Sequence, residues 1–188
     1  MTTQSPHFAR TAARRRGQDG FTLIELLIVV AMIAVLATIA FPILLRARIT
    51  SNEGVAVASL RTIHSAQAAY ASSCGSGGYA QTLADLELEP PGAAVGFIQE
   101  PYTSDGVVVN GYVANLMAAG DATTMLDAND TCNGSSMDAV TSFVAERHPV
   151  SVGETGVRSF AIDTQGTMYM RQDGDPIDDA LTDTQVFQ

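Results

Sequence analysis

Lysine and tryptophan are absent from this chain of 188 residues, which holds only three histidines and two cysteines. Zinc sites and nucleophilic catalytic sites need several such side chains, or Asp and Glu, at defined spacings. His64 and His148 have no carboxylate at such a motif spacing, and a solvated surface position explains both. The glycine-rich stretch CGSGG at 74–78 is not followed by Lys, which excludes a phosphate-binding loop. The sequence therefore does not predict an enzyme.

Positive charge is also scarce. All ten basic residues are Arg, against twenty Asp and Glu, and the formal net charge is −10. Four of the arginines lie in the first twenty residues, so that six basic and nineteen acidic residues follow Gly20, a net charge of −13. Phosphate binding needs a basic face, and this composition excludes nucleic acid as a partner.

One long apolar run stands out against this background. Between Phe21 and Leu45 the only ionisable residue is Glu25, and residues 26–45 are apolar apart from one threonine. A helix of this length spans the ~30 Å hydrocarbon core of a membrane. Four arginines precede the run and only Arg46 and Arg48 follow it closely, so we expect the N-terminus in the cytoplasm and the rest of the chain outside.

The helix is expected to continue beyond the membrane. Four apolar residues recur every seven positions, which is helical spacing: Ile49, Ala56, Ile63 and Tyr70. Leu60 and Ala66 fall on the same stripe of the helix. The next strong stop is the glycine-rich stretch at 74–78, so the pattern predicts one helix over 21–73. Pro42 lies inside it and is expected to bend it.

Beyond residue 74, short β-branched runs alternate with Gly, Asn, Asp and Pro, a pattern typical of strands and turns. The sequence predicts a helical turn at 82–88 and an antiparallel sheet from four segments, 106–116, 141–146, 157–163 and 166–172, the last two joined by the turn DTQG. Residues 117–138 are interpreted as a long polar connection, and the tail after Asp173 is acidic. The predicted fold class is α+β, with a long N-terminal helix packed against a small antiparallel sheet.

The segment RRRGQDGFTLIELLIVV, residues 14–30, differs from a secretory signal peptide because its small residue, Gly20, precedes the apolar run. Cleavage at Gly20 would leave the apolar helix on the mature protein. A basic leader, a Gly, a Phe and a Glu five positions into the run together resemble the class III signal of type IV prepilins and of the pseudopilins of type II secretion. Residues 46–80 resemble these families more loosely.

The resemblance implies a role for each residue of the motif. Gly20 would be the last residue of a leader removed by prepilin peptidase, and Phe21 the new N-terminus, which the same enzyme N-methylates. Glu25 would meet the N-terminal amine of a neighbouring subunit. Physical reasoning agrees, since a carboxylate inside a span costs roughly 2.5–3.5 kcal/mol on insertion scales and needs a cation as partner. Many pilins have Gly where this chain has Ala34, so any local melting of the helix would depend on Pro42.

The two cysteines, Cys74 and Cys132, both lie on the expected oxidising side of the membrane, and we predict a disulfide between them. Two free thiols are the alternative.

The acidic tail carries four carboxylates that suit a hard cation, Asp173, Asp175, Asp178 and Asp179. The resemblance adds that some pseudopilins bind calcium in a C-terminal loop, so calcium is a candidate ligand. The tail lacks the Gly and Glu spacing of a defined calcium loop, and a solvated acidic tail is the alternative. No other cofactor is predicted.

Four segments follow from these arguments: a cleaved leader (1–20), a membrane and filament-core helix (21–45), its amphipathic continuation (46–74) and an extracytoplasmic β domain (75–188). The predicted function is a structural subunit of a type IV pilus or pilus-like filament. Its expected partners are copies of itself, prepilin peptidase, an assembly platform of the inner membrane and the membrane itself. The alternatives are a pseudopilin of type II secretion, a filament-initiating minor subunit, and a membrane-anchored enzyme or binding domain that uses the helix only as a tether.

Overall fold

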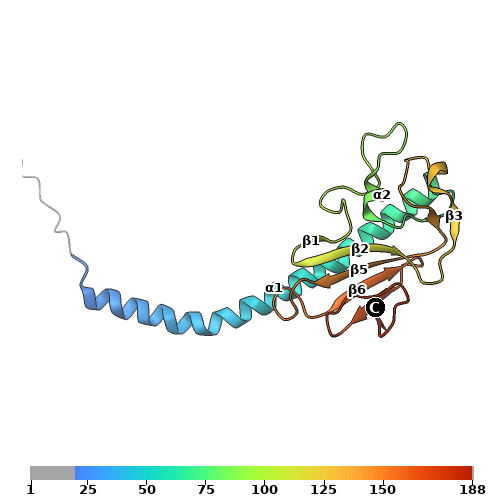
Figure 1. The fold of residues 1–188 in the computed structure, drawn as a ribbon. Coiled ribbons are helices and arrows are strands. Elements are labelled where there is room, and N and C mark those ends of the chain that lie inside the picture. Colours follow the sequence, from blue (N-terminus) through green and yellow to red (C-terminus); the bar gives the residue numbers. More distant parts are fainter. Residues whose placement is uncertain (1–19, 188) are drawn as a thin grey trace, which may run out of the picture. The chain divides into compact units, whose positions relative to one another are not determined.

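The computed structural model describes residues 20–187 and has the expected α+β fold (Figure 1). The basic leader up to residue 19 lies outside the described residues. The chain divides into two compact units between Phe41 and Pro42, and each is described by itself. The helix α1, Leu23–Ser73, runs through both units. The unit from Pro42 onward is called the head unit below.

Helix α1 begins two residues later than the pattern predicts, because Thr22 caps it. The backbone N–H of Glu25 donates to the Thr22 hydroxyl at 3.3 Å, which satisfies one of the free donors at the helix start. At the other end, Cys74 and Gly75 both donate backbone hydrogen bonds to the Tyr70 carbonyl, and Gly77 has a positive φ of 92°. The glycine-rich stretch therefore ends the helix, as predicted.

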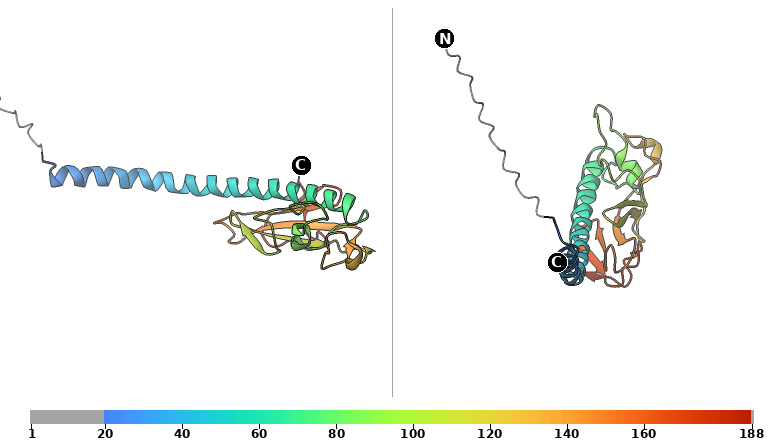
Figure 2. Two further views of the ribbon diagram at one scale, coloured as in Figure 1. Left: turned by 90° about the horizontal axis from the view of Figure 1, so that it is seen from above. Right: turned by 90° about the vertical axis from the view of Figure 1, so that its left-hand side faces the viewer.

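In the head unit, α1 lies along the sheet (Figure 2), and the predicted apolar stripe packs against it from Ala56 onward, while Ile49 is half-buried and outside the core. Ala56, Leu60, Ile63 and Tyr70 have no exposed surface, and Ala66 is 5% exposed. The opposite face is exposed and carries small or polar residues such as Ala58, Arg61 and Ser65. Pro42 lies inside α1, which remains helical on both sides of it, and the expected bend stays a prediction.

The main sheet has six antiparallel strands in the order β1-β2-β5-β6-β7-β8. Their bounds are β1 Val107–Val109, β2 Tyr112–Ala118, β5 Phe143–Pro149, β6 Ser159–Asp163, β7 Met168–Arg171 and β8 Gln185–Val186. Strand β5 pairs with β2 and β6, and alternate residues of these central strands face α1. The turn between β6 and β7 is the predicted DTQG, closed by a hydrogen bond from Gly166 N–H to the Asp163 carbonyl.

The segment 106–116, interpreted as one strand, is a hairpin of β1 and β2. Asn110 and Gly111 both have positive φ, 51° and 74°, and form the two-residue turn between the strands. Such Asn-Gly turns match the twist of antiparallel strands, and this local signal was present in the sequence. Strand β1 is thus an edge strand.

The long connection and the tail also hold more structure than the sequence suggests. Residues 117–138 include β3 Thr124–Leu126 and the short 3-10 helix η1 Ala128–Asp130, and β3 pairs with β4 Ala139–Val140 in a separate two-stranded sheet. In the tail, Ile177 is only 2% exposed and β8 extends the main sheet. The predicted helical turn at 82–88 is present as α2 Leu83–Glu87, capped by the Thr82 hydroxyl.

A buried amide joins α1 to the segment that follows it. The Gln67 side chain, which has no exposed surface, donates to the Ala80 carbonyl at 2.7 Å and accepts from the Ala80 N–H at 2.9 Å. This pair of bonds reproduces the exchange between two paired strands. It satisfies both polar groups of a residue in the apolar core.

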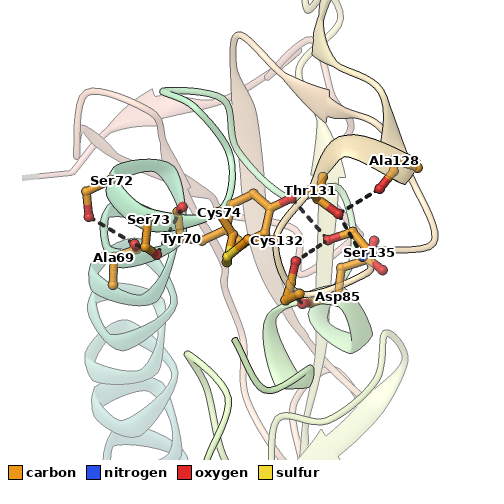
Figure 3. The surroundings of a disulfide bond; sticks show 11 residues. Ala69, Tyr70, Ser72, Ser73, Cys74, Asp85, Ala128, Thr131, Cys132 and Ser135 are labelled. Carbon is orange, nitrogen blue, oxygen red and sulfur yellow. Dashed lines mark hydrogen bonds between the residues drawn. A yellow bond between two sulfur atoms is a disulfide. The ribbon is translucent and has the colours of Figure 1, made fainter. Parts of the chain in front are cut away.

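Cys74 and Cys132 form a disulfide, with their Cα atoms 4.6 Å apart (Figure 3). The bond joins the end of α1 to the segment after η1, across 58 positions of sequence. Beside it the Tyr70 and Ser135 hydroxyls lie 3.0 Å apart, and burial raises the pKa of Tyr70. The Ser136 N–H and hydroxyl both donate to the buried Asp85 carboxylate, which fixes the segment onto α2.

Replacing Gln67 by Ala should destabilise the head unit by about 3 kcal/mol, because it leaves the buried N–H and carbonyl of Ala80 without partners. Urea unfolding of the detergent-solubilised protein, followed by circular dichroism, measures the change. Gln165→Ala removes an exposed glutamine and is the matched control, with an expected change within about 0.5 kcal/mol. Equal effects of the two substitutions would contradict the assignment.

Non-reducing peptide mapping should recover Cys74 linked to Cys132 from protein taken directly from the cell envelope. Replacing both by Ser should lower the free energy of unfolding by about 4 kcal/mol, the loop-closure entropy of a ring of this length. The reduced wild type is the control, and it should match the double variant. Free, alkylatable thiols in the envelope protein would refute the bond.

Candidate processing and assembly site

The peptide bond between Gly20 and Phe21 lies before the helix in exposed, irregular backbone. No atom lies within 4 Å of a Cβ built on Gly20, and Phe21 is 74% exposed. A peptidase needs an extended substrate that it can reach, and a bond inside α1 would not offer one. The described residues therefore leave this bond open to cleavage.

Glu25 lies in the first turn of α1, where the helix dipole favours a carboxylate. Its side chain is exposed, and the ion pairs found within residues 20–187 do not include it. On either side of it the large side chains are apolar. The carboxylate thus stands as an isolated acid near the start of an apolar surface.

Within the unit up to Phe41, no other part of the described chain packs on that apolar surface. None of the most apolar 18-residue window of α1 is buried, and its mean hydropathy is 2.9. The side chains of Leu23, Leu36 and Phe41 are 81%, 67% and 73% exposed. By length and composition α1 can cross a membrane. In water so much exposed apolar surface would drive association, so lipid or other helices must cover it.

Three of the four candidate carboxylates of the tail have partners within the chain. The carboxylate of Asp173 lies 2.9 Å from the Arg171 guanidinium, and Asp175 lies 3.7 Å from it. The Thr182 N–H and hydroxyl donate to Asp178. A backbone N–H from Asp175 and the Arg171 side chain lower the pKa of Asp173, and the bonds from Thr182 lower that of Asp178.

No group of three or more His, Cys, Asp or Glu side chains within residues 20–187 is placed to hold a metal ion. The backbone carbonyl of Asp179 accepts from the Gly120 N–H at 3.0 Å. Calcium binding by the tail stays a prediction from the sequence.

Glu53 was not singled out in the sequence, yet it holds α1 to the start of β6. It is 7% exposed and accepts hydrogen bonds from the Arg158 side chain and from the N–H groups of Val157 and Arg158. This contact raises the pKa of the Arg158 guanidinium.

A signal for the buried polar residues of α1 does exist in the sequence. A second series with seven-residue spacing runs beside the apolar series of Ile63: Glu53, Leu60, Gln67 and Cys74. All four are buried. A polar residue at such a position has to find a partner inside the protein, and so the spacing marks Glu53 and Gln67 as contact residues.

Comparison with known proteins identifies the N-terminal part of the chain. The family described as the prokaryotic N-terminal methylation motif matches residues 15–41. The chain is 56% identical over 45 residues to the type IV wide pilus major component PilA4 of Thermus thermophilus. The match covers 24% of this chain and 34% of that protein, so the chain spans about a third of the length of this curated relative. No solved structure matches the chain.

The matched region contains Gly20, Phe21, Glu25 and most of the apolar run. The resemblance to type IV pilins found in the sequence is therefore confirmed. This chain carries the prokaryotic N-terminal methylation motif in a segment that is similar to a type IV pilin, and its long apolar helix followed by an antiparallel sheet is consistent with a pilin-like fold.

Proposed function

We propose that the chain is a structural subunit of a type IV pilus or pilus-like filament, which is held in the inner membrane until it is polymerised. One observation carries this proposal. The methylation motif leads directly into a helix whose apolar half has no cover within its own unit. The name of the relative from Thermus thermophilus, a pilus major component, supports the same function.

Processing would take place at the exposed bond before α1. Prepilin peptidase hydrolyses the bond after Gly20, and the new α-amine on Phe21 then receives a methyl group from a methyl donor. Thr22 caps the helix without help from the leader, so α1 keeps its start after cleavage. The products are a free leader and a subunit whose apolar helix begins with a cation.

Glu25 would set the register between subunits. A carboxylate in a span needs a cation, and a protonated or methylated amine of a neighbour supplies one at the same depth of the filament. The pair satisfies two charges that would be costly alone. Because every subunit has both groups, each copy can bind the next in the same way.

Close packing of apolar helices would provide the rest of the assembly energy. Apolar side chains gain little from one another in lipid, so association depends on how closely the helices approach. Ala31 forms a notch on α1 between the larger side chains of Leu27 and Val35. A second helix can place a side chain there. The inner-membrane assembly platform would supply the energy to extract the helix from lipid.

The pseudopilin alternative has the same signal, processing and helix, and differs in where the filament ends. We favour the pilus because the relative is named as a pilus component. A tethered enzyme would require a convergent catalytic cluster, and within residues 20–187 the histidines do not form one. His64 lies 3.2 Å from the Thr164 carbonyl, and His148 pairs with the buried Glu146.

Intact mass and N-terminal sequencing of the membrane-purified protein should show a chain that begins at N-methylated Phe21. The expected reason is cleavage after Gly20 by a peptidase that also methylates the product. A strain without the peptidase is the control and should retain the leader. A mature chain that starts upstream of Gly20, or one that is cut after the apolar run, would refute the proposal.

Replacing Glu25 by Ala should abolish filaments without affecting insertion, processing or the head unit. The variant leaves the neighbour's amine without a partner in an apolar environment, at a cost of roughly 3–5 kcal/mol for each contact. The measurement is the amount of subunit in the sheared filament fraction relative to the membrane fraction.

Thr38→Ala is the matched control within the apolar run. The Thr38 hydroxyl donates to the Val35 carbonyl of its own helix at 2.7 Å, so it needs no partner from another subunit. Its removal should leave filament yield unchanged. A processed Glu25→Ala protein with wild-type filament yield would show that the carboxylate does not set the register, and that the helix serves only as a tether.

A further inference from the structure

The first eight residues of the loop between β5 and β6, residues 150–157, are fixed to α1. The Asn52 side chain on α1 donates to the Thr155 carbonyl at 2.9 Å. On its other side the Val150 N–H donates to the Gly111 carbonyl, in the turn between β1 and β2, at 3.0 Å. The loop, this turn and α1 therefore meet at the same place. We call residues 150–157 the valine loop.

The valine loop is ordered by its own hydrogen bonds. The Ser151 N–H donates to the Thr155 hydroxyl at 3.1 Å, and the Thr155 N–H donates to the Ser151 carbonyl at 3.0 Å. The Gly153 N–H donates to the Gly156 carbonyl at 2.7 Å. A loop with this many internal bonds presents its side chains in fixed directions.

Three of those side chains are valines that face solvent. Val150, Val152 and Val157 are 55%, 53% and 43% exposed. Single exposed apolar residues are ordinary, but three on one ordered loop of eight residues concentrate apolar surface there, and we call these three valines the patch. The single acidic residue of the loop, Glu154, accepts a hydrogen bond from the Ser151 hydroxyl.

The position of the loop along α1 indicates what covers this patch. Within the head unit the apolar run ends with Ile43, Leu44 and Leu45, which are exposed. Asn52, which holds the loop, follows Leu45 by seven residues, or about 10 Å of helix. The headgroup layer of one leaflet is roughly 5–8 Å thick. The point at which α1 holds the valine loop thus lies just beyond the headgroup layer of a bilayer whose hydrocarbon core ends at Leu45.

Two arginines lie between the apolar run and the loop. Arg46 and Arg48 are exposed on α1, and the ion pairs found within residues 20–187 include neither of them. Arginines that directly follow a span lie at the level of the lipid phosphates. Exposed valines next to two cations match the chemistry of the interfacial region of a phospholipid membrane.

We propose that the valine loop docks on the outer leaflet of the membrane before the subunit enters a filament, with Arg46 and Arg48 on the phosphates. This inference rests on the proposed function, since it needs the anchored subunit. The anchor makes the contact intramolecular, so a weak interaction is enough to keep it formed. Docking would hold the head unit in one orientation toward the assembly machinery, and extraction of the helix would release it.

The absence of tryptophan makes the contact directly measurable, because one introduced Trp reports alone. Val152→Trp, and Val150→Trp as a second variant, are reconstituted at one chain per nanodisc, with and without lipids brominated near the headgroups. We expect emission at shorter wavelength than for a Trp in water, and loss of emission with the brominated lipids. Replacing Arg46 and Arg48 by Gln in the Val152→Trp protein should reduce that loss.

Val95→Trp is the matched control, since Val95 is 51% exposed but lies two residues from Phe97, which packs on Tyr70 at the far end of the buried stripe. It should not be quenched. Leu36→Trp, in the apolar run, tests the anchor with lipids that are brominated deep in the acyl chains, because residue 36 lies about 13 Å of helix inside Leu45. If Leu36→Trp is quenched and neither valine variant is, docking is refuted while the anchor stands. If Leu36→Trp is not quenched either, the membrane anchor fails and both proposals with it. If the Trp emission of the valine variants moves to shorter wavelength only when a disc holds several chains, a second copy covers the patch and lipid docking is refuted.

Discussion

The uncovered apolar surface of α1 between Leu23 and Leu45 is the constraint on which the rest of the structure depends. One helix has to satisfy two environments, because its first half exposes apolar side chains on all sides and its second half buries a single stripe. The first half is stable only in lipid or among other helices. The second half makes the head unit possible, since the sheet packs on its stripe. The proposed processing, anchoring and assembly would all concern the first half.

Much of this division can be predicted from the sequence, because it depends on local periodicity. The seven-residue recurrence of apolar residues defines the buried stripe, and the glycine-rich stretch defines where the helix stops. The motif around Gly20 and Glu25 is also local, and the comparisons confirm it as pilin-like. The hairpin at 106–116 was missed because β-branched residues on both sides of Asn110 and Gly111 look like one continuous strand, although the turn itself was readable.

Other features could not be predicted because their partners are distant in sequence. The partners of Glu53 lie more than one hundred residues away, at Val157 and Arg158. Strand β8 has two residues inside an acidic tail, and its pairing is decided by the exposed edge of β7 and not by its own composition. In each case tertiary contact overrides local preference. The seven-residue spacing shows that Glu53 and Gln67 are buried, but the partner of each is set by the fold.

The buried polar residues of α1 fix the helix to the sheet, which matters if, as proposed, the helix moves from lipid into a filament. Glu53 fixes the first turn of the buried stripe to the start of β6, and the disulfide at Cys74 fixes its last turn. Gln67, which lies between Glu53 and Cys74 on α1, joins the helix to Ala80. A force along the helix axis would shift α1 against the sheet, and apolar contacts alone resist such sliding weakly because they have no direction. Hydrogen bonds, an ion pair and a covalent bond are directional, and they set one register of α1 on the sheet. Glu53 and Gln67 therefore fix the register of α1 on the sheet, a contact that is otherwise apolar. Glu25 is proposed to fix the register between helices of the filament in the same way.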